Sequence, residues 1–165
     1  MSRLCILVLR AGVVAAVLAG LFGQIVVIPA TAAGEVDRFP PYAPFATPYV
    51  TVAIVCVACV QVGLVALWQL LAMVDHGAIF TPRAFRWVDT IIGAAAVATL
   101  LAAGVAGHLA LADIPSPDDG MEVVSALFSA VTGAGAGGAF VMLVVVLRGL
   151  LRKATDLQSE IAEVI

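Results

Sequence analysis

The feature that most constrains the fold of this chain is a set of four apolar stretches, each about 25 residues long. They cover residues 4–28, 49–74, 88–112 and 123–147. An α-helix needs about 20 apolar residues to cross a hydrocarbon core of ~30 Å, whereas strands of a membrane barrel show short segments of alternating polarity. The sequence therefore predicts an all-α integral membrane protein with four spanning helices.

Composition supports a membrane environment. Of the 165 residues, 63% are hydrophobic and 12% are charged, which gives a mean hydropathy of +1.15. A water-soluble domain of this length could not bury so much apolar surface. We expect a single membrane domain built as a four-helix bundle, surrounded by the lipid bilayer. The net charge is −3 and the basic residues are scattered, so direct nucleic-acid binding is not indicated.

The basic residues also predict the orientation, because short loops rich in lysine and arginine stay in the cytoplasm. With the N-terminus inside, seven basic residues lie on the inner side and one, Arg38, lies outside. The seven are Arg3, Arg10, Arg83, Arg86, Arg148, Arg152 and Lys153. Both termini are therefore predicted to be cytoplasmic, with a helical extension over residues 148–165 on the same side.

The first stretch has an alternative interpretation as a secretory signal. Arg3 and Arg10 precede an apolar run, and Ala30-Thr31-Ala32 resembles a small-residue cleavage site. The apolar run from Ala11 to Ile28 alone has 18 residues, which is longer than the core of a usual signal peptide. We therefore expect an uncleaved helix.

The segments between the spans have contrasting character. The outer segments, Pro29 to Pro48 and Asp113 to Glu122, are acidic and rich in proline, and we expect them to be loops. On the inner side, Gly77 suits the end of the second helix and Thr81-Pro82 the start of the third. Arg83 and Arg86 are expected to contact lipid phosphates there.

Small residues four apart predict close contacts between helices in the membrane. They recur in the first, third and fourth spans, at Gly12, Ala16 and Gly20, at Ala98, Ala102 and Ala106, and at Gly133 and Gly137. Gln61 lies near the middle of the second span, where an unpaired amide costs a few kcal/mol. We expect it to face the interior and to bond a neighbouring helix, with Thr99 at about the matching depth.

Cys56 and Cys59 have the spacing of thiol redox motifs and share one helix face. Buried cysteines also pack as small apolar side chains, so packing is the first interpretation and a thiol redox role the second. The two histidines, His76 and His108, are predicted at opposite ends of the spans and cannot share one haem iron. An outer-leaflet metal site of His108 with the two cysteines is a further alternative. The sequence indicates no cofactor.

The tail after the fourth span continues a helical pattern. Its apolar residues recur at steps of four and three, at Leu150, Ala154, Leu157, Ile161 and Val164. This spacing is typical of a coiled-coil seam, although two heptads are too short to stand alone. Asp156, Glu160 and Glu163 make its end acidic. The tail is either a solvated helix end or a docking surface.

The turn GAIFTP at Gly77 to Pro82 and the tail LRKATDLQSEIAEVI at Leu151 to Ile165 resemble a bacterial family of four-span membrane proteins, domain of unknown function 2975. The resemblance implies that Gly77, Phe80 and Thr81 of the turn are characteristic positions. It implies the same for Glu160 and Ile165 of the tail. Some family members are encoded beside a small helix-turn-helix regulator, which implies a cytoplasmic protein partner.

These observations favour a non-enzymatic protein of the bacterial inner membrane. Its cytoplasmic turn and tail, with Arg83 beside them, would bind a protein partner or a second copy of the chain. One alternative is a thiol redox or metal-binding protein that uses Cys56 and Cys59. Another is a channel or transporter subunit whose oligomers are lined by Gln61.

Overall fold

A computed structural model of the chain describes residues 3–75, 82–117 and 120–163. In chain order, the elements are α1 (Arg3–Phe22), the π-helical turn η1 (Gly23–Val27), α2 (Ile28–Arg38), the 3₁₀ turn η2 (Pro40–Tyr42), α3 (Ala43–Asp75), α4 (Pro82–Leu111) and α5 (Met121–Glu163). No strand occurs in these ranges, so the all-α prediction is confirmed.

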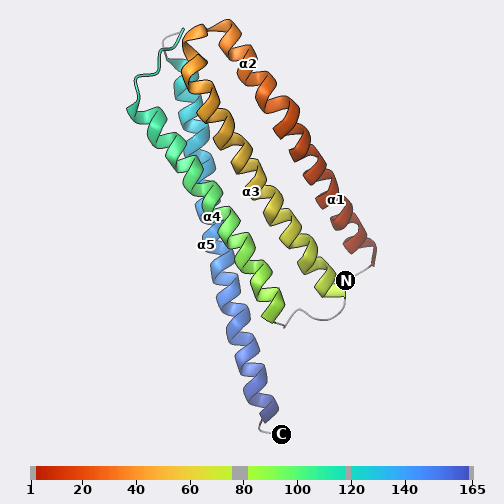
Figure 1. Cartoon of the computed structure of the whole chain (residues 1–165). Coiled ribbons are helices and arrows are strands. Elements are labelled where there is room, and N and C mark those ends of the chain that lie inside the picture. The colour runs from red at the N-terminus through yellow and green to blue at the C-terminus, as the bar shows by residue number, and fades with distance from the viewer. Residues whose placement is uncertain (1–2, 76–81, 118–119, 164–165) are drawn as a thin grey trace.

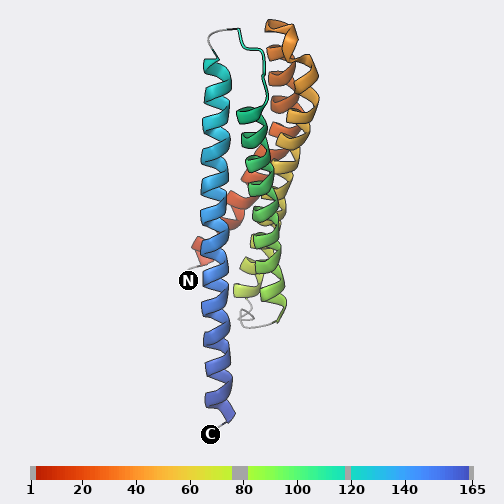
Figure 2. The same ribbon diagram turned by 90° about the vertical axis from the view of Figure 1, so that its left-hand side faces the viewer.

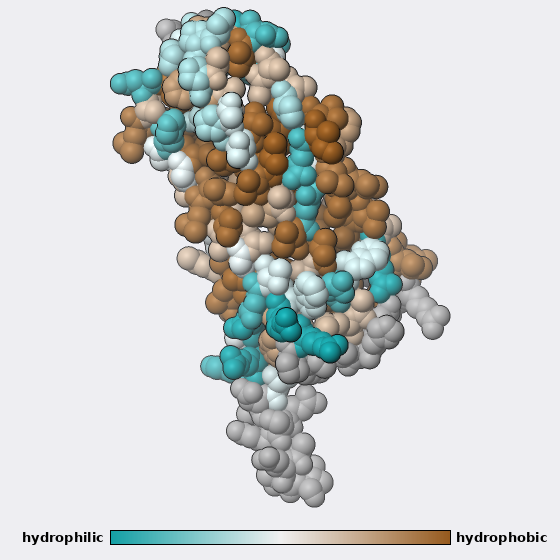
Figure 3. All heavy atoms as spheres, in the orientation of Figure 1, coloured by the Kyte–Doolittle hydropathy of each residue, from teal (hydrophilic) through white to brown (hydrophobic). Residues whose placement is uncertain are grey.

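Four helical segments are long and apolar enough to cross a membrane, as predicted. They are Ile6–Arg38, Pro40–Met73, Arg83–Leu111 and Met121–Thr155. Large apolar side chains such as Leu100 and Phe128 point outward and are 71% and 74% exposed. Figure 3 shows the same arrangement as an apolar band between two more hydrophilic ends. A hydrocarbon surround accounts for this surface, because water would make it costly.

The helices pack largely in chain order. α3 contacts α1, α2 and α4, and α5 contacts α4. Within the described ranges, no Cα atom of α5 lies within 8 Å of a Cα atom of α1, α2 or α3. Figures 1 and 2 show that the start of α1 and the end of α5 lie toward the same end of the molecule. At this end, α5 extends well beyond the other helices.

The predicted loop from Pro29 to Pro48 is wrong. Residues up to Arg38 continue the first helix as α2, and α3 already begins at Ala43, so the connection is short and centred on η2. The prolines misled the prediction. Pro29 comes just after the π-helical turn η1 inside a continuous helix, so its missing N–H alters the helical hydrogen bonding without ending the helix, and Pro48 lies inside α3 near its start.

The other two connections agree better with the sequence. α4 begins at Pro82, as expected for a first helical position. The link between α4 and α5 ends at Gly120, whose φ of 78° is a left-handed conformation suited to glycine. The predicted turn residues Gly77, Phe80 and Thr81 lie outside the described residues.

Two of the predicted glycines mediate close helix contacts and two do not. A β-carbon added at Gly20 would crowd the side chain of Gln61 on α3, and one at Gly137 would collide with Thr99 on α4. Added β-carbons at Gly12 and Gly133 would meet no atom within 4 Å. The small-residue pattern therefore located the contacts only in part, because spacing alone does not say which turn faces a neighbour.

Candidate functional site

A cavity of about 800 Å³ lies at the end of the molecule where α2 meets α3 and α4 leads to α5. All four of these helices line it, and most of the lining is apolar. Its polar lining residues are Glu35, Tyr42, Tyr49, Glu122, Ser125 and Ser129. This size and this mixture of an apolar wall with a few polar groups are typical of small-molecule sites.

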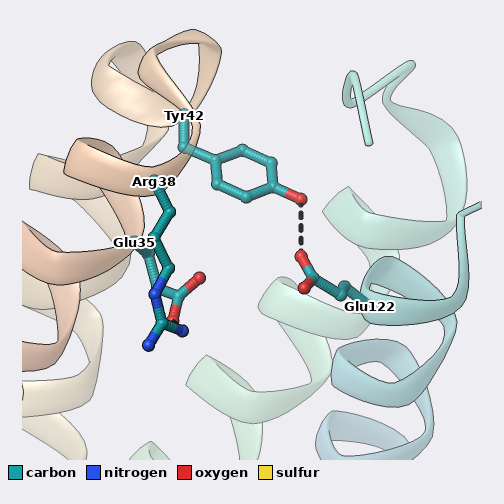
Figure 4. Close-up of polar contacts among 4 residues, drawn as sticks. All are labelled: Glu35, Arg38, Tyr42 and Glu122. Carbon is teal, nitrogen blue, oxygen red and sulfur yellow. Dashed lines mark hydrogen bonds and ion pairs between the residues drawn. The ribbon is translucent and has the colours of Figure 1, made fainter. Parts of the chain in front are cut away.

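A hydrogen bond joins the two sides of the cavity mouth. The Tyr42 hydroxyl, in η2, donates to Glu122 Oε2 in the first turn of α5 at 3.1 Å. Figure 4 shows this tyrosine reaching across from the α2–α3 corner to α5. Beside it, Arg38 Nη1 lies 3.4 Å from Glu35 Oε1, and the two side chains are 80% and 50% exposed. An ion pair this exposed to solvent is weak, and Arg38 therefore neutralises the negative charge of Glu35 only in part.

A second polar contact lies deeper along α3. The Tyr49 hydroxyl and Nδ1 of His108, on α4, are hydrogen bonded at 2.8 Å, and the Phe45 ring lies 6.3 Å from the histidine ring. Within the described ranges, no three His, Cys, Asp or Glu side chains gather as metal ligands. The suggested metal site of His108 with Cys56 and Cys59 is therefore not formed, because His108 faces the two aromatic rings instead.

An apolar groove of about 650 Å³ lies next to the cavity, toward the middle of the molecule, between α3, α4 and α5. Residues seven apart lie on one helix face. Ile91 and Ala98 of the groove share such a face with Val105 of the cavity, and Gly133 of the groove shares one with Ala126. The two hollows therefore lie next to each other along the same faces of α4 and α5.

Cys56 and Cys59 both line this groove, as expected from their spacing. Both are free thiols and half-buried, and Cys56 Sγ lies 3.9 Å from the Ala98 carbonyl oxygen. The side chain of Cys5 is not among those described.

Two glutamines form hydrogen bonds between the first membrane-spanning helix and α3: Gln61 lies on α3, and Gln24 lies in η1. Gln61 Nε2 lies 3.4 Å from the Val17 carbonyl oxygen, and Gln24 Nε2 donates to the Ile54 carbonyl oxygen at 3.1 Å. Each glutamine thus bonds the helix opposite, two turns from the other bond. The prediction that Gln61 bonds Thr99 was wrong, because Gln61 bonds α1 and the Thr99 hydroxyl donates to the Ala95 carbonyl oxygen of its own helix. An amide held against α1 also disfavours a pore lined by Gln61.

The opposite end of the molecule holds an ion pair between α4 and α5. Arg148 Nε lies 2.6 Å from Asp89 Oδ1, and its Nη2 donates to Oδ2 at 2.9 Å. Arg83 is exposed in the first turn of α4. Glu160 belongs to the described helix α5, but its side chain and all of Ile165 lie outside the described part.

The sequence model of a family described as protein of unknown function (DUF2975) matches residues 30–165. The chain belongs to this family. The resemblance inferred from the turn and the tail is therefore confirmed. No curated protein and no solved structure matches the chain.

The matched range contains every residue that lines the cavity and the groove, as well as the tail of α5. It does not include α1 or Gln24. In this DUF2975 chain, the cavity thus lies in the part shared with the family. The family description names no activity, and the residues that line the cavity are therefore the only indication of what the cavity could bind.

Sequence reasoning missed the cavity residues Tyr42, Tyr49 and Glu122, because it treated the α2–α3 corner as a loop. It also missed Gln24. The signal for Gln24 was available, since it is a second amide inside an apolar stretch and the argument made for Gln61 applies to it equally.

Proposed function

We propose that the chain is a non-enzymatic, multi-pass protein of the bacterial inner membrane that binds a cytoplasmic protein partner through the extension of α5. Both termini are cytoplasmic in this proposal, and the spans form an open four-helix bundle. The supporting observation is the length of α5, which runs from Met121 to Glu163 and projects beyond the other helices (Figure 2).

The extension is anchored near its base, and its last turns project beyond the described helix α4 (Figure 2). The Asp89–Arg148 ion pair ties α5 to α4. At 1.5 Å per residue, residues 148–163 rise about 24 Å further. Among the described side chains of this extension, Thr155 bonds only to the backbone of its own helix. A helix of this length gains little stability by itself in water, so a partner would stabilise it.

The sequence of the extension specifies the chemistry of that partner. Leu157 and Ile161 continue the apolar seam, and Asp156, Glu160 and Glu163 flank it without a basic residue after Lys153. A partner helix with an apolar seam and basic flanks would complement this surface. A parallel second copy would bring like charges together. A small helix-turn-helix regulator, which the family resemblance implies, is the kind of partner we propose.

Photo-cross-linking from single positions tests this proposal. A photoreactive residue at Leu157 or Ile161 should give one adduct of defined mass in native membranes, and Ser159, on the opposite side of the helix, is the matched control. Charge reversal of Asp156, Glu160 and Glu163 to lysine should abolish the adduct. Equal labelling from Ser159, adducts of the chain with itself alone, or an adduct insensitive to the charge reversal would contradict the proposal.

A thiol-based role is a second candidate, because Cys56 and Cys59 line the same apolar groove. Their spacing of three residues on a helix is compatible with a disulfide. The chain isolated from membranes with thiols blocked at lysis should then contain a fraction that lacks the blocking groups of both cysteines and is two hydrogens lighter than the unblocked chain; this fraction should be absent in Cys59→Ala. A fully reduced pair under oxidising growth conditions would exclude this role.

A further inference from the structure

We propose that the cavity between α2, α3, α4 and α5 binds a free amphiphile with a single ammonium head, and that its alkyl chain lies along the apolar groove. This inference is independent of the partner proposed for the tail of α5, because the two features lie at opposite ends of the molecule (Figure 1).

The shape of the hollow favours an amphiphile. The cavity of about 800 Å³ and the groove of about 650 Å³ lie next to each other along the same faces of α4 and α5. Polar groups gather in the cavity, whereas the lining of the groove is almost entirely apolar. A ligand that matches both parts has a compact polar head and a long apolar chain.

The charge of the lining favours a cation. Two carboxylates, Glu35 and Glu122, line the cavity, and no lysine, arginine or histidine does. Tyr42 donates a hydrogen bond to Glu122 but is itself neutral, so the negative charge remains. Arg38 neutralises Glu35 only weakly, because both side chains are exposed.

Aromatic rings complete a site suited to ammonium. Tyr42, Phe45 and Tyr49 all line the cavity, and the faces of such rings attract ammonium groups. A zwitterionic phospholipid would bring a phosphate as well, and no basic side chain of the lining is available to receive it. The lining therefore favours a free ammonium amphiphile over an aminophospholipid of the bilayer.

The test uses the full chain in phosphatidylcholine nanodiscs and a tetradecyltrimethylammonium probe with a photoreactive diazirine in its chain. Labelled peptides should map to the groove and the adjoining part of the cavity, for example near Ala98 and Gly133. Unlabelled tetradecyltrimethylammonium should compete, and tetradecyl sulfate should not. Glu122→Gln should weaken binding about tenfold, as expected for the loss of one charge-assisted contact.

Asp37→Asn is the matched control, because Asp37 is an exposed carboxylate on α2 that does not line the cavity. It should leave the affinity unchanged. Ala126→Leu keeps the charge but fills part of the cavity, so it should reduce labelling by a different route, and it provides the test if Glu122→Gln fails to fold. Labelling spread over the lipid-facing surface of α1, equal competition by the sulfate, or equal loss in Asp37→Asn would overturn the proposal. Competition by phosphatidylethanolamine as strong as by the free ammonium would assign the site to the bilayer lipid and contradict the proposal.

Discussion

At the scale of single residues, close contacts in this protein depend on which glycine of a pair faces a neighbouring helix. Gly133 and Gly137 are one turn apart on α5, yet only Gly137 lies against a side chain, that of Thr99 on α4. Membrane helices associate through such close packing, since lipid offers no hydrophobic force between them. The pair therefore gives a matched comparison.

Alanine at Gly137 should be less stabilising than alanine at Gly133. Both changes gain up to about 1 kcal/mol of helix propensity, but at Gly137 the added methyl group collides with Thr99, which costs roughly 1–3 kcal/mol. Reversible unfolding in mixed micelles measures the difference. Adding Thr99→Ala to Gly137→Ala should restore most of it, and equal stabilities of the two alanine variants would contradict the contact.

The two glutamines act at the same scale. Replacing Gln24 or Gln61 by leucine should lower the free energy of unfolding by about 0.6 kcal/mol each, the average for a hydrogen bond between membrane helices. Gln69→Leu is the control, because Gln69 is exposed on α3. The double variant should lose the sum, as the bonds are two turns apart. No loss in either variant would show that the bonds are not formed in the membrane.

At the scale of elements, α5 combines two functions in one continuous helix. Most of its length packs against α4, and only its C-terminal end projects beyond the other helices (Figure 2). Asp89 lies about two turns from the start of α4 at Pro82, so the Asp89–Arg148 ion pair ties α5 to α4 near the point where the projection begins. The pair thus holds the base of the extension in place.

Breaking this ion pair should change the motion of the extension more than the stability of the fold. The two side chains are 49% and 32% exposed, so Asp89→Asn should cost no more than about 1 kcal/mol. A spin label at Lys153 should become more mobile in Asp89→Asn. Its mobility should return to the original value when Asp89→Arg is combined with Arg148→Asp. Arg152→Gln is the control, and the same mobility in all variants would argue against anchoring.

At the scale of the whole molecule, the α2–α3 corner that holds the acidic cavity and the projecting end of α5 lie at opposite ends (Figure 1). The distribution of basic residues predicts that the tail is cytoplasmic and that the cavity opens toward the outer side. The proposed amphiphile would then enter from the outer leaflet.

Labelling of single cysteines checks this orientation. In a variant without the three native cysteines, an impermeant maleimide added to intact cells should label a cysteine at Asp37 or Asp113. A cysteine at Lys153 should react only after the cells are permeabilised. These side chains are exposed, so access depends on the side of the membrane. The reverse pattern would refute the predicted orientation.

The sequence by itself determined the features that depend on local composition. Apolar length predicted four spans, and Pro82 marked the start of α4. The turn and tail motifs identified the family. These predictions succeed because burial in lipid depends on the residues of one helix and because the motifs are contiguous.

Only the tertiary structure decided what the helices place together. Tyr42 and Glu122 are 80 residues apart, and their contact depends on the helix continuing through Pro29. Gln61 bonds α1 rather than α4 because the rotation of α3 turns its amide toward Val17. Helix rotation and neighbour order arise from packing along whole helices, and an apolar sequence with few polar positions does not specify them locally. The cavity, which four helices line jointly, follows from that packing.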